Sequence, residues 1–335
     1  MKAECIREKL LHALLRADKV TGKNPSLAIL SCVVLAAEGN ELVLKSTNLE
    51  VGLEIVIPAK VDLSGVVAIQ ADILASFLSN TPQEKNVTLE MQDTTLVVKA
   101  GLQSASIKTF AYDDFPGIPS GAEDKTDVDV EDFFKGLQSV WYSASVSSIK
   151  PELSSVYVYN QGDNLVFVAT DSFRLAEKRV KMRDVPQDFQ LLVPFKNIGD
   201  IIKAFEGVTG SVELSYNKNQ LTLRTDSIYL TSRLVDGIFP DYKKIVPTEH
   251  ATEATVLKSD FIQALRMMRV FSDKFNQVSL AVSNQKAHVE FASKNSDVGE
   301  GNYTIKSKVV GDSVKLTFNH KYLVDCLSAI PAESI

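Results

Sequence analysis

The sequence predicts an α+β protein built from three copies of one unit, each with two helices and an antiparallel sheet. Short motifs recur at one spacing, and segments of helical periodicity alternate with segments of strand periodicity. The clearest recurrences are "ELVLKSTNLE" at 41–50, "NLVFVATDSF" at 164–173 and "AHVEFASKNS" at 287–296. Thr47 and Thr170 in the first two are 123 residues apart. This period is too long for a solenoid, so each unit is expected to have its own core.

Six segments have the apolar spacing of helices. Their windows are 6–19, 71–79, 131–145, 196–206, 259–274 and 319–330. In the first window, Ile6, Leu10 and Leu14 fall on one stripe, which predicts a helix with one buried face. The pair Ser259–Asp260 and the single residue Asn319 are of the types that cap helix N-termini, so the last two helices are expected to begin beside them.

Segments with alternating apolar residues lie between the predicted helices and are typical of strands. They are separated by polar turns with the sequences "EGN", "QGDN", "NKNQ" and "SNQK". Each unit is therefore expected to contain a helix, two or three strands, a second helix, and three or four further strands. Gly39 and Gly162 fall in corresponding turns of the first two units, again 123 residues apart.

The repeat places the expected domains at 1–124, 125–249 and 250–335. Three periods of this length need more than 335 residues, so the third domain is expected to lack its closing strands. A sheet without these strands would leave a strand edge and part of its core open. Two explanations fit the sequence: the native protein is longer, or another element completes the third domain.

Composition and charge are those of an ordinary globular chain, with 45% hydrophobic and 23% charged residues. No run of about 18 apolar residues occurs, so no membrane partner is expected. Cys5, Cys32 and Cys326 are odd in number and far apart, which favours reduced thiols and a cytoplasmic location. The net charge of −6 argues against an open basic surface for nucleic acid, so such a role needs cations gathered on one face.

Enzyme signatures are missing: the sequence contains no P-loop, G-x-G-x-x-G, C-x-x-C or G-x-S-x-G. We therefore expect no catalytic residue and no cofactor. The histidines fall at unlike positions of different units, which argues against a metal site: His12, His250, His288 and His320. The acidic run "DVDVED" at 127–132 resembles a metal-binding stretch but lacks the glycine and final glutamate of a calcium loop. We expect it to lead from a strand into a helix N-terminus, where acidic side chains favour the dipole.

Two motifs carry a resemblance to a known family: "VATDSFRLA" at 168–176 and "LVDGIFPDYKKIVP" at 234–247. With "DDFP" at 113–116, they make the sequence similar, from Met1 to Ile335, to the bacterial β sliding clamp family. Its members form the processivity ring of the replicative DNA polymerase. The resemblance implies three clamp domains, each with two helices on one side of a curved antiparallel sheet. It also implies a homodimer in which two chains join head to tail into a ring around double-stranded DNA.

The resemblance implies a pocket for short peptide motifs of partner proteins, namely the DNA polymerase, the clamp loader and repair proteins. The matching residues are Leu153, Thr170, Ser172, Phe173, Arg174, Leu175, Pro240, Lys244 and Ile245. Leu153, Leu175 and Ile245 would help to form an apolar slot. Arg174 would close over it with donors for a peptide backbone. The alternative is a plain strand end, but the first unit lacks the Phe and Arg at its matching turn, which favours a function in the second.

The resemblance also implies the DNA-facing and dimer residues. Candidates for sequence-independent contact with phosphates are Lys19, Lys23, Lys203, Arg266 and Arg269. Candidates for the dimer interface are Ile107 in the strand 104–110, Val270 and Phe271, with the strand 302–310 pairing with 104–110. Plain alternatives exist for both sets: solvated surface charge for the lysines and internal core for the interface residues. A closed ring stays on DNA by topology, so weak phosphate contacts suffice even in an acidic protein.

Three functions stay open on the sequence. The first is the DNA sliding clamp, a non-enzymatic tether for processive replication. The second is a clamp-like scaffold or regulator without ring closure, which the short third domain prompts. The third is an enzyme that acts through Asp171 and Arg174, although no base, nucleophile or cofactor motif accompanies them.

Overall fold

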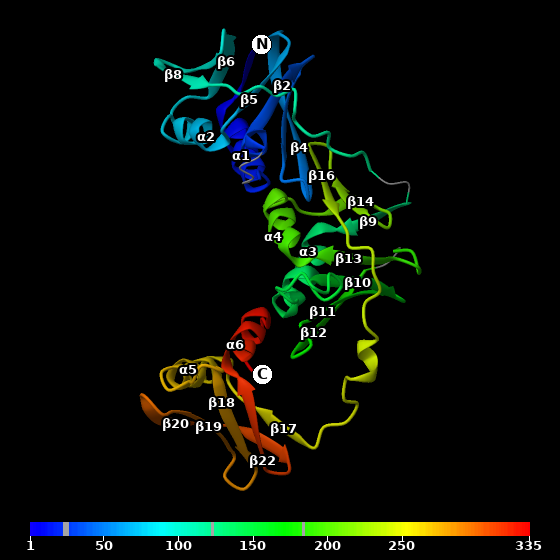
Figure 1. Ribbon diagram of the computed structural model, residues 1–335, viewed down its shortest axis with the longest axis vertical. Helices are drawn as coiled ribbons and strands as arrows, with labels where there is room; N and C mark the ends of the chain where they lie inside the picture. The colour runs from blue at the N-terminus through cyan, green and yellow to red at the C-terminus, as the bar shows by residue number, and fades with distance from the viewer. Residues whose placement is uncertain (23–26, 122–123, 183–184) are drawn as a thin grey trace. The chain divides into compact units, whose positions relative to one another are not determined.

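The computed structural model describes residues 1–22, 27–121, 124–182 and 185–335 (Figure 1). Helices alternate with antiparallel strands along the chain, as expected for an α+β fold. The described chain forms two compact units. Unit 1 comprises Met1–Leu137, Ser147–Phe167 and Arg179–Gly237, and unit 2 comprises Gln138–Val146, Val168–Lys178 and Ile238–Ile335.

The elements follow a similar order in each third of the chain. The first third contains β1 (Lys2–Ile6), α1 (Arg7–Lys19), the 3-10 turn η1 (Ala28–Ser31), β2 (Val33–Glu38), β3 (Glu41–Thr47), β4 (Val51–Leu63), β5 (Gly65–Ile69), α2 (Ala71–Ser79), β6 (Asn86–Gln92), β7 (Thr95–Ala100) and β8 (Gln103–Lys108). The middle third contains β9 (Asp124–Asp129), α3 (Val130–Val140), the 3-10 turn η2 (Trp141–Ser143), β10 (Ser155–Gln161), β11 (Asn164–Thr170), β12 (Leu175–Lys181), β13 (Gln190–Pro194), α4 (Phe195–Ala204), β14 (Ser211–Tyr216), β15 (Gln220–Arg224) and β16 (Ile228–Arg233). The last third contains the 3-10 turn η3 (Tyr242–Lys244), β17 (Thr252–Thr255), α5 (Lys258–Arg269), β18 (Gln277–Ser283), β19 (His288–Asn295), β20 (Gly299–Lys306), β21 (Lys308–Gly311), β22 (Val314–Asn319) and α6 (His320–Ala329).

The expected number of strands between the two helices of a unit is wrong. In the described residues, the first two thirds each have four strands there, because the short strands β5 and β13 lead directly into α2 and α4. The predicted polar turns are confirmed where they can be compared. Gly39 joins β2 to β3 at φ +58° and Gly162 joins β10 to β11 at φ +68°, a conformation that glycine adopts without steric cost.

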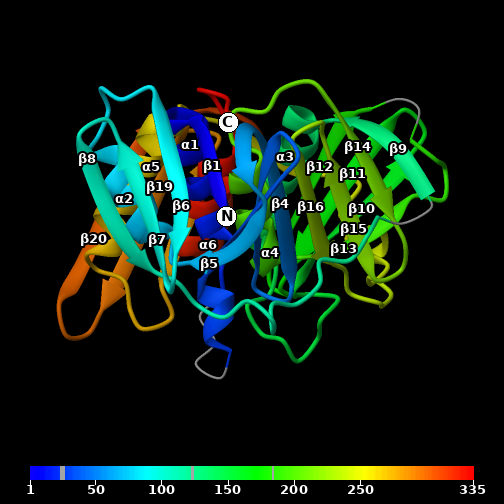
Figure 2. The same ribbon diagram turned by 90° about the horizontal axis from the view of Figure 1, so that it is seen from above.

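The largest sheet that the described residues form has twelve strands and lies in unit 1. Its main path is β8-β7-β6-β1-β4-β16-β15-β14-β9. Strand β4 is 13 residues long and pairs with β1, β3 and β16. Figure 2 shows β4 and β16 side by side, with α4 packed against them. The β4–β16 pairing makes one continuous sheet from strands of the first and second repeats, which the repeat pattern did not predict.

The helices bury the faces that their apolar spacing predicts. Leu10 and Leu14 of α1 are fully buried, and α1 packs against α2 (Figure 1). Ile6, expected on the same face, is 37% exposed because it is the last residue of β1 and precedes the helix. Helices α3 and α5 end at Val140 and Arg269, earlier than the predicted windows.

One of the two predicted N-caps is confirmed. Asn319 Oδ1 accepts a hydrogen bond from Lys321 N at 3.0 Å at the start of α6. The pair Ser259–Asp260 is not a cap, because α5 begins at Lys258 and the pair lies in its first turn. The Lys258 N–H donates to the Glu333 carbonyl at 2.9 Å, so a backbone group takes the place of a side-chain cap.

The acidic run at 127–132 is the strand-to-helix junction that the sequence predicts. Strand β9 ends at Asp129, and α3 begins at Val130. Asp129 Oδ1 accepts a hydrogen bond from Asp132 N at 3.0 Å and so satisfies a free N–H of the first helical turn. In the described residues, no three His, Cys, Asp or Glu side chains gather in a group that could hold a metal ion. None of the described helices has the length and apolar content that a membrane crossing requires.

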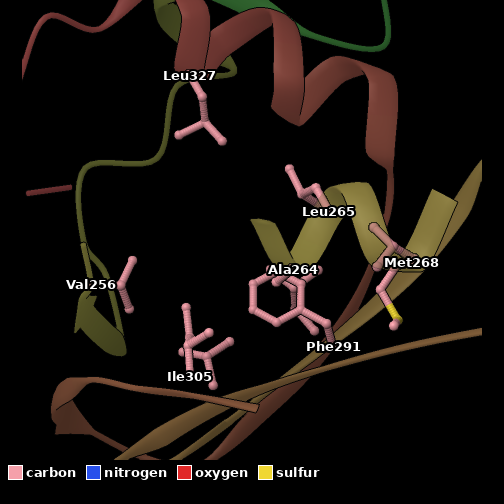
Figure 3. Packing of buried hydrophobic residues seen from close by; sticks show 10 residues of the cluster. Val256, Ala264, Leu265, Met268, Phe291, Ile305 and Leu327 are labelled. Atoms are coloured by element: carbon pink, nitrogen blue, oxygen red, sulfur yellow. The ribbon is translucent and has the colours of Figure 1, made fainter. Parts of the chain in front are cut away.

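Unit 2 has its own core between α5, α6 and the sheet β20-β19-β18-β22 (Figure 3). Phe291 of β19 is fully buried in a cluster with Leu265 of α5 and Ile305 of β20. The ring of Phe261 meets that of Phe291 edge-on, with centroids 4.8 Å apart. Burial of one such side chain contributes roughly 1.5–3 kcal/mol, so this cluster holds α5 on its sheet. A two-stranded sheet of β17 and β21 completes the unit.

Candidate functional site

The motif at 170–174 forms a tight turn between β11 and β12 in unit 2. Thr170 Oγ1 donates to Arg174 O at 2.7 Å and accepts from Ser172 N at 3.1 Å. Asp171 Oδ1 accepts from Phe173 N at 2.9 Å and from Arg174 N at 3.0 Å. Ser172 adopts φ +77°, a left-handed conformation that few residues other than glycine take. Two side chains thus fix the backbone here, which is more than a plain strand end needs.

Arg174 is held by two carboxylates and two aromatic rings. Its Nε donates to Asp171 Oδ2 at 3.0 Å, and its Nη1 donates to Asp325 Oδ2 at 2.7 Å. Its guanidinium carbon lies 4.3 Å from the ring centre of Tyr322 and 5.6 Å from that of Tyr142. Burial would lower the pKa of Arg174, but the two aspartates raise it above its ordinary value. The site therefore holds one fixed cation whose remaining N–H groups can meet carbonyl groups of a ligand.

The phenol of Tyr142 stays neutral beside this cation. Burial, followed by a hydrogen bond with Cys326, raises the pKa of Tyr142 to about 12, while the charge of Arg174 opposes the rise. A neutral phenol keeps its O–H as a donor at every physiological pH. Tyr142 therefore contributes an uncharged ring with a polar hydroxyl beside the Arg174 guanidinium.

The second motif presents apolar side chains around two buried anchors. The rings of Phe239 and Tyr242 are buried and meet edge-on, with centroids 6.2 Å apart. The hydroxyl of Tyr242 donates to Glu177 Oε2 at 2.6 Å. Ile238 is 91% exposed and Ile245 is 72% exposed. Large apolar side chains held outward in this way are typical of a docking surface.

The structure brings eight of the nine predicted pocket residues into unit 2. Phe173 is 85% exposed, Leu175 is partly buried, and Pro240 and Lys244 are exposed. Leu153 lies in unit 1, where it is buried. Membership of all nine residues in one pocket stays a prediction.

Sequence reasoning missed the partners that Arg174 has outside its own turn. Tyr322 and Asp325 lie on α6, and Asp325 is 151 residues away along the chain. The sequence did show that these two residues, three positions apart on a predicted helix, share one face of it. It did not show that this face contacts Arg174. Tyr142 lies in η2, where the predicted helix changes to a 3-10 turn.

A groove of about 450 Å³ in unit 1 brings together cations from α1 and α4. Its lining residues are His12, Leu15, Arg16, Lys19, Lys203 and Glu206. Arg16 Nη2 donates to the Glu206 carbonyl at 2.6 Å. Burial lowers the pKa of Arg16, and the charge of Glu206 opposes this. The predicted DNA-facing residues Lys19 and Lys203 are therefore neighbours, and the sequence analysis left His12 and Arg16 out of that set.

The remaining DNA-facing candidates do not line this groove. Arg266 and Arg269 are both exposed on the last turn of α5 in unit 2, where cations also favour the helix dipole. Lys23 lies outside the described residues. Contact of these residues with DNA stays a prediction.

Both strands predicted to meet at the dimer interface are sheet edges in their own sheets. Strand β8 lies at one end of the twelve-stranded sheet, and β20 lies at one end of the sheet of unit 2. Ile107 is only 4% exposed, in agreement with the alternative of internal core. Phe271 covers β20 so closely that a Cβ added to Gly301 would come within 2.6 Å of its ring. Val270, at 61% exposed, is the candidate with free apolar surface.

The chain matches three family models in order. They are the DNA polymerase III beta subunit N-terminal domain over residues 1–119, its central domain over 127–241 and its C-terminal domain over 243–335. The "Beta sliding clamp" of Synechococcus elongatus is 26% identical over 343 residues, covering 100% of this chain and 92% of that protein. The "Beta sliding clamp homolog GriR" of Streptomyces muensis is 27% identical over 339 residues, covering 99% of this chain and 89% of that protein.

Solved structures show the same fold. The DNA polymerase III subunit beta of Pseudomonas aeruginosa superimposes with a TM-score of 0.91 at 24% identity, covering 100% of this chain and 92% of that one. A second structure from that organism, bound to griselimycin, gives a TM-score of 0.91 at 24% identity and covers 100% and 91% of the two chains. At this identity the likeness concerns the fold alone.

Proposed function

The chain belongs to the DNA polymerase III beta subunit family, and from that premise we propose how it works as a DNA sliding clamp in replication. Two chains would join head to tail into a ring that encircles duplex DNA and tethers partner proteins to it. The observation that carries this proposal is the match, in order and from Met1 to Ile335, to all three domains of the family. The free thiols of Cys5, Cys32 and Cys326 support the expected cytoplasmic location.

The role proposed here is mechanical and uses no catalytic residue. Asp171, the acid that the enzymatic alternative needs, accepts two backbone N–H groups and the Arg174 guanidinium. Both of its carboxylate oxygens are thus occupied by groups of the turn itself. This supports a structural part for Asp171 in the turn.

Partner proteins would bind by short peptides at the turn 170–174 and the segment 238–246. Phe173, Ile238 and Ile245 offer exposed apolar surface, and Arg174 offers donors to peptide carbonyl groups. One buried apolar anchor contributes about 1.5–3 kcal/mol, so a few of them suffice for a micromolar complex at about −8.2 kcal/mol. A weak and exchangeable site suits a clamp that hands DNA from one partner to the next.

The duplex would face the helices that carry Lys19, Lys203, Arg266 and Arg269. The groove between α1 and α4 supports this for unit 1, because it gathers Arg16, Lys19 and Lys203 on one surface of an acidic protein. Contacts of this kind bind phosphates without reading base sequence, and ring closure would hold the clamp on DNA. We expect the affinity for a short linear duplex to be weak and to fall steeply with salt.

Ring closure would pair the β8 edge of one chain with the β20 edge of the other, since both edges lack a second partner strand in the described residues. The interface is heterologous, and two copies of it close the ring. Val270 would pack at its centre.

The test is the native mass of the full chain. We expect an assembly of twice the 36.8 kDa subunit, and a monomer for Val270→Asp. Val146→Asp is the matched control, because Val146 is also a valine of unit 2 and is 86% exposed. A stable wild-type monomer would overturn ring closure and leave a clamp-like scaffold. A Val270→Asp protein that still dimerises would show that the interface lies elsewhere.

A further inference from the structure

A second groove lies in unit 1, whereas the turn 170–174 and the segment 238–246 belong to unit 2. It is a cavity of about 500 Å³ beside the loop that joins β3 to β4. The lining residues that matter here are Thr47, Leu49, Pro116, Pro119, Arg233 and Leu234. The walls come from β4 and β16, which are paired strands of one sheet, so the cavity is built into a rigid part of the molecule.

The loop beside this cavity repeats the hydrogen bonds of the turn at 170–174. Thr47 Oγ1 donates to Val51 O at 2.8 Å and accepts from Leu49 N at 3.0 Å. Asn48 Oδ1 accepts from Glu50 N at 3.0 Å and from Val51 N at 2.8 Å. These are the four bonds that Thr170 and Asp171 make, at positions 123 residues earlier.

The loop that follows each domain is repeated as well. Phe115 packs against the core cluster around Ile29, while Pro116 lines the cavity. In unit 2, Phe239 is buried while Pro240 is exposed. In both places the aromatic ring packs against the protein, and the proline keeps some exposed surface, partly for Pro116 and largely for Pro240. The cavity thus has the same two walls as the proposed peptide site, a Thr-Asx turn and a Phe-Pro loop.

The third position of this turn is left-handed in both repeats, and in the first repeat a leucine, Leu49, fills it. It adopts φ +74°, where glycine and asparagine are comfortable and a leucine is not, and it is 41% exposed at the cavity. The matching residue of the second turn is Ser172, with φ +77°. A strained, exposed apolar side chain at a cavity is the kind of outlier that points to function.

The cavity lining contains one acidic side chain, Glu50, and one basic side chain, Arg233. Glu50 pairs with Lys196 Nζ at 3.8 Å. Arg233 is exposed, and in the described part of the chain its guanidinium has no acceptor within hydrogen-bonding distance. An acidic group brought in by a ligand would complete this set.

We propose that this groove is a second peptide-binding site, which takes an extended segment of a partner protein with one large apolar side chain and one carboxylate. The apolar side chain packs on Leu49, Pro116 and Leu234, and the carboxylate meets Arg233. The inference rests on the proposed function, because the class of ligand is that proposed for the matching turn. It adds a second tether on each chain, so that each chain of the ring holds two partners at once.

The experiment is photo-crosslinking of the full chain with a benzophenone-labelled hexapeptide that contains two leucines, one phenylalanine and one aspartate. Mass spectrometry of the digested protein then maps the labelled segments. We expect labels at both 47–52 and 170–175. Leu49→Asn and Arg233→Glu should each lower labelling at 47–52 at least tenfold and leave labelling at 170–175 unchanged.

Leu63→Asn is the matched control, because Leu63 is a leucine of the same unit that is 61% exposed and lies outside the cavity lining. It should leave both labels unchanged. Leu49→Asn should also keep or raise the melting temperature, since asparagine tolerates the left-handed conformation better than leucine. A melting temperature that falls while labelling persists would mean that Leu49 is structural, and the inference would be wrong.

The remaining outcomes separate this inference from the proposed function. Labels at 170–175 alone would overturn the second site and leave the first. Labels at neither segment would overturn peptide binding by this chain altogether. A change in native mass for Leu49→Asn would show that the groove contacts a second copy of the chain, and would also overturn the proposal.

Discussion

The turn 47–51 in unit 1 and the turn 170–174 in unit 2 share the same four side-chain hydrogen bonds and present different surfaces. In both, a buried threonine and an Asn or Asp fix the backbone. The next side chains diverge, because Glu50 and Val51 stand where Phe173 and Arg174 stand in the second turn. The comparison teaches that the threonine and the Asn or Asp that follows it are sufficient to form the turn. The later positions of the turn can therefore vary and bind a ligand.

The third repeat shows what happens when the scaffold residues change. Lys294 stands where Asn48 and Asp171 stand, so no side-chain acceptor is available for the backbone of a turn. Ser293, at the threonine position, instead shares its hydroxyl hydrogen between the carbonyls of Phe271 and Gln277. The hairpin continues through this point, with β19 paired to β20 as far as Asn295. The Thr-Asx pair is thus the cause of the turn in the first two repeats.

The largest expected effect comes from removing the shared threonine hydroxyl. Thr47→Val and Thr170→Val each abolish two hydrogen bonds of a buried residue, 6% and 7% exposed. We expect each to lower the free energy of unfolding by about 1–3 kcal/mol, because two hydrogen bonds of a buried hydroxyl are lost, each contributing about 0.5–1.5 kcal/mol. Urea unfolding followed by circular dichroism measures both, and fluorescence of Trp141 reports on unit 2. A loss confined to one of the two turns would break the comparison.

Phe173→Ala tests whether the divergent positions carry recognition. Because Phe173 is 85% exposed, the free energy of unfolding should change little. The affinity for a fluorescein-labelled peptide with leucine and phenylalanine side chains should fall at least tenfold, or about 1.4 kcal/mol, by fluorescence polarisation. Glu50→Ala changes the same position of the first turn and should leave the affinity at 170–174 as it is. Equal affinity of wild type and Phe173→Ala would exclude Phe173 as an anchor.

The choice between Asn and Asp in the two turns has a measurable electrostatic cause. Asp171 faces Arg174, whereas the Asn48 amide donates to Asp200 Oδ2 at 3.2 Å. Asp171→Asn should keep the turn but cost about 1 kcal/mol or less at neutral pH, since one ion pair is lost.

The reverse change, Asn48→Asp, should destabilise unit 1 near neutral pH by placing a second carboxylate against Asp200, whose pKa burial already raises. The loss should diminish as the pH falls and one of the two carboxyls takes up a proton. Urea midpoints of both variants at pH 4 and pH 7 measure this. If Asn48→Asp is as stable as wild type at pH 7, the amide contact with Asp200 is unimportant.

The smallest expected effect is a loss of stability at alkaline pH that comes from Tyr142, which contacts Arg174 of the second turn. The pKa of Tyr142 is raised to about 12 in the folded protein, against an ordinary value near 10. Between these two pH values the unfolded chain loses the phenolic proton and the folded chain keeps it, so stability is complete below pH 10 and falls toward pH 12. Tyr142→Phe should show a smaller decline in urea midpoint over this range. The same slope in both proteins would contradict the burial of this phenol.

Much of the fold could be predicted because it depends on local pattern. The apolar spacing located all six described helices, and the turns at Gly39 and Gly162 located two of the hairpins. Caps and helix ends were less predictable, since the N-terminus of α5 has its first N–H bound by the distant Glu333 carbonyl. For Ile107 the sequence left interface and internal core open, because alternation shows that one face of a strand is covered but not whether its own chain covers it; in the single chain Ile107 is 4% exposed.

The candidate site divides in the same way between local and distant contributions. The residues of the turn 170–174 are neighbours in the sequence, so the motif "TDSFRL" located them. Asp325 and Tyr322 could not be predicted as partners of Arg174. Asp325 follows it by 151 residues, and the pattern of a helix does not show which distant residue it will contact. The groove at 47–52 could not be predicted either, because its lining comes from segments that are far apart in the sequence.

The sequence by itself determined the three-fold repeat, the helices, the two Thr-Asx turns and the family. These follow from periodicity and from hydrogen bonds between residues four or fewer positions apart. Only the tertiary structure decided that β4 pairs with β16, that Arg174 is held by α6, and that cations of α1 and α4 line one groove. Those contacts join segments that are far apart in the sequence. The order of segments along the chain does not show which of them will meet, because burial of apolar surface in the folded protein decides that.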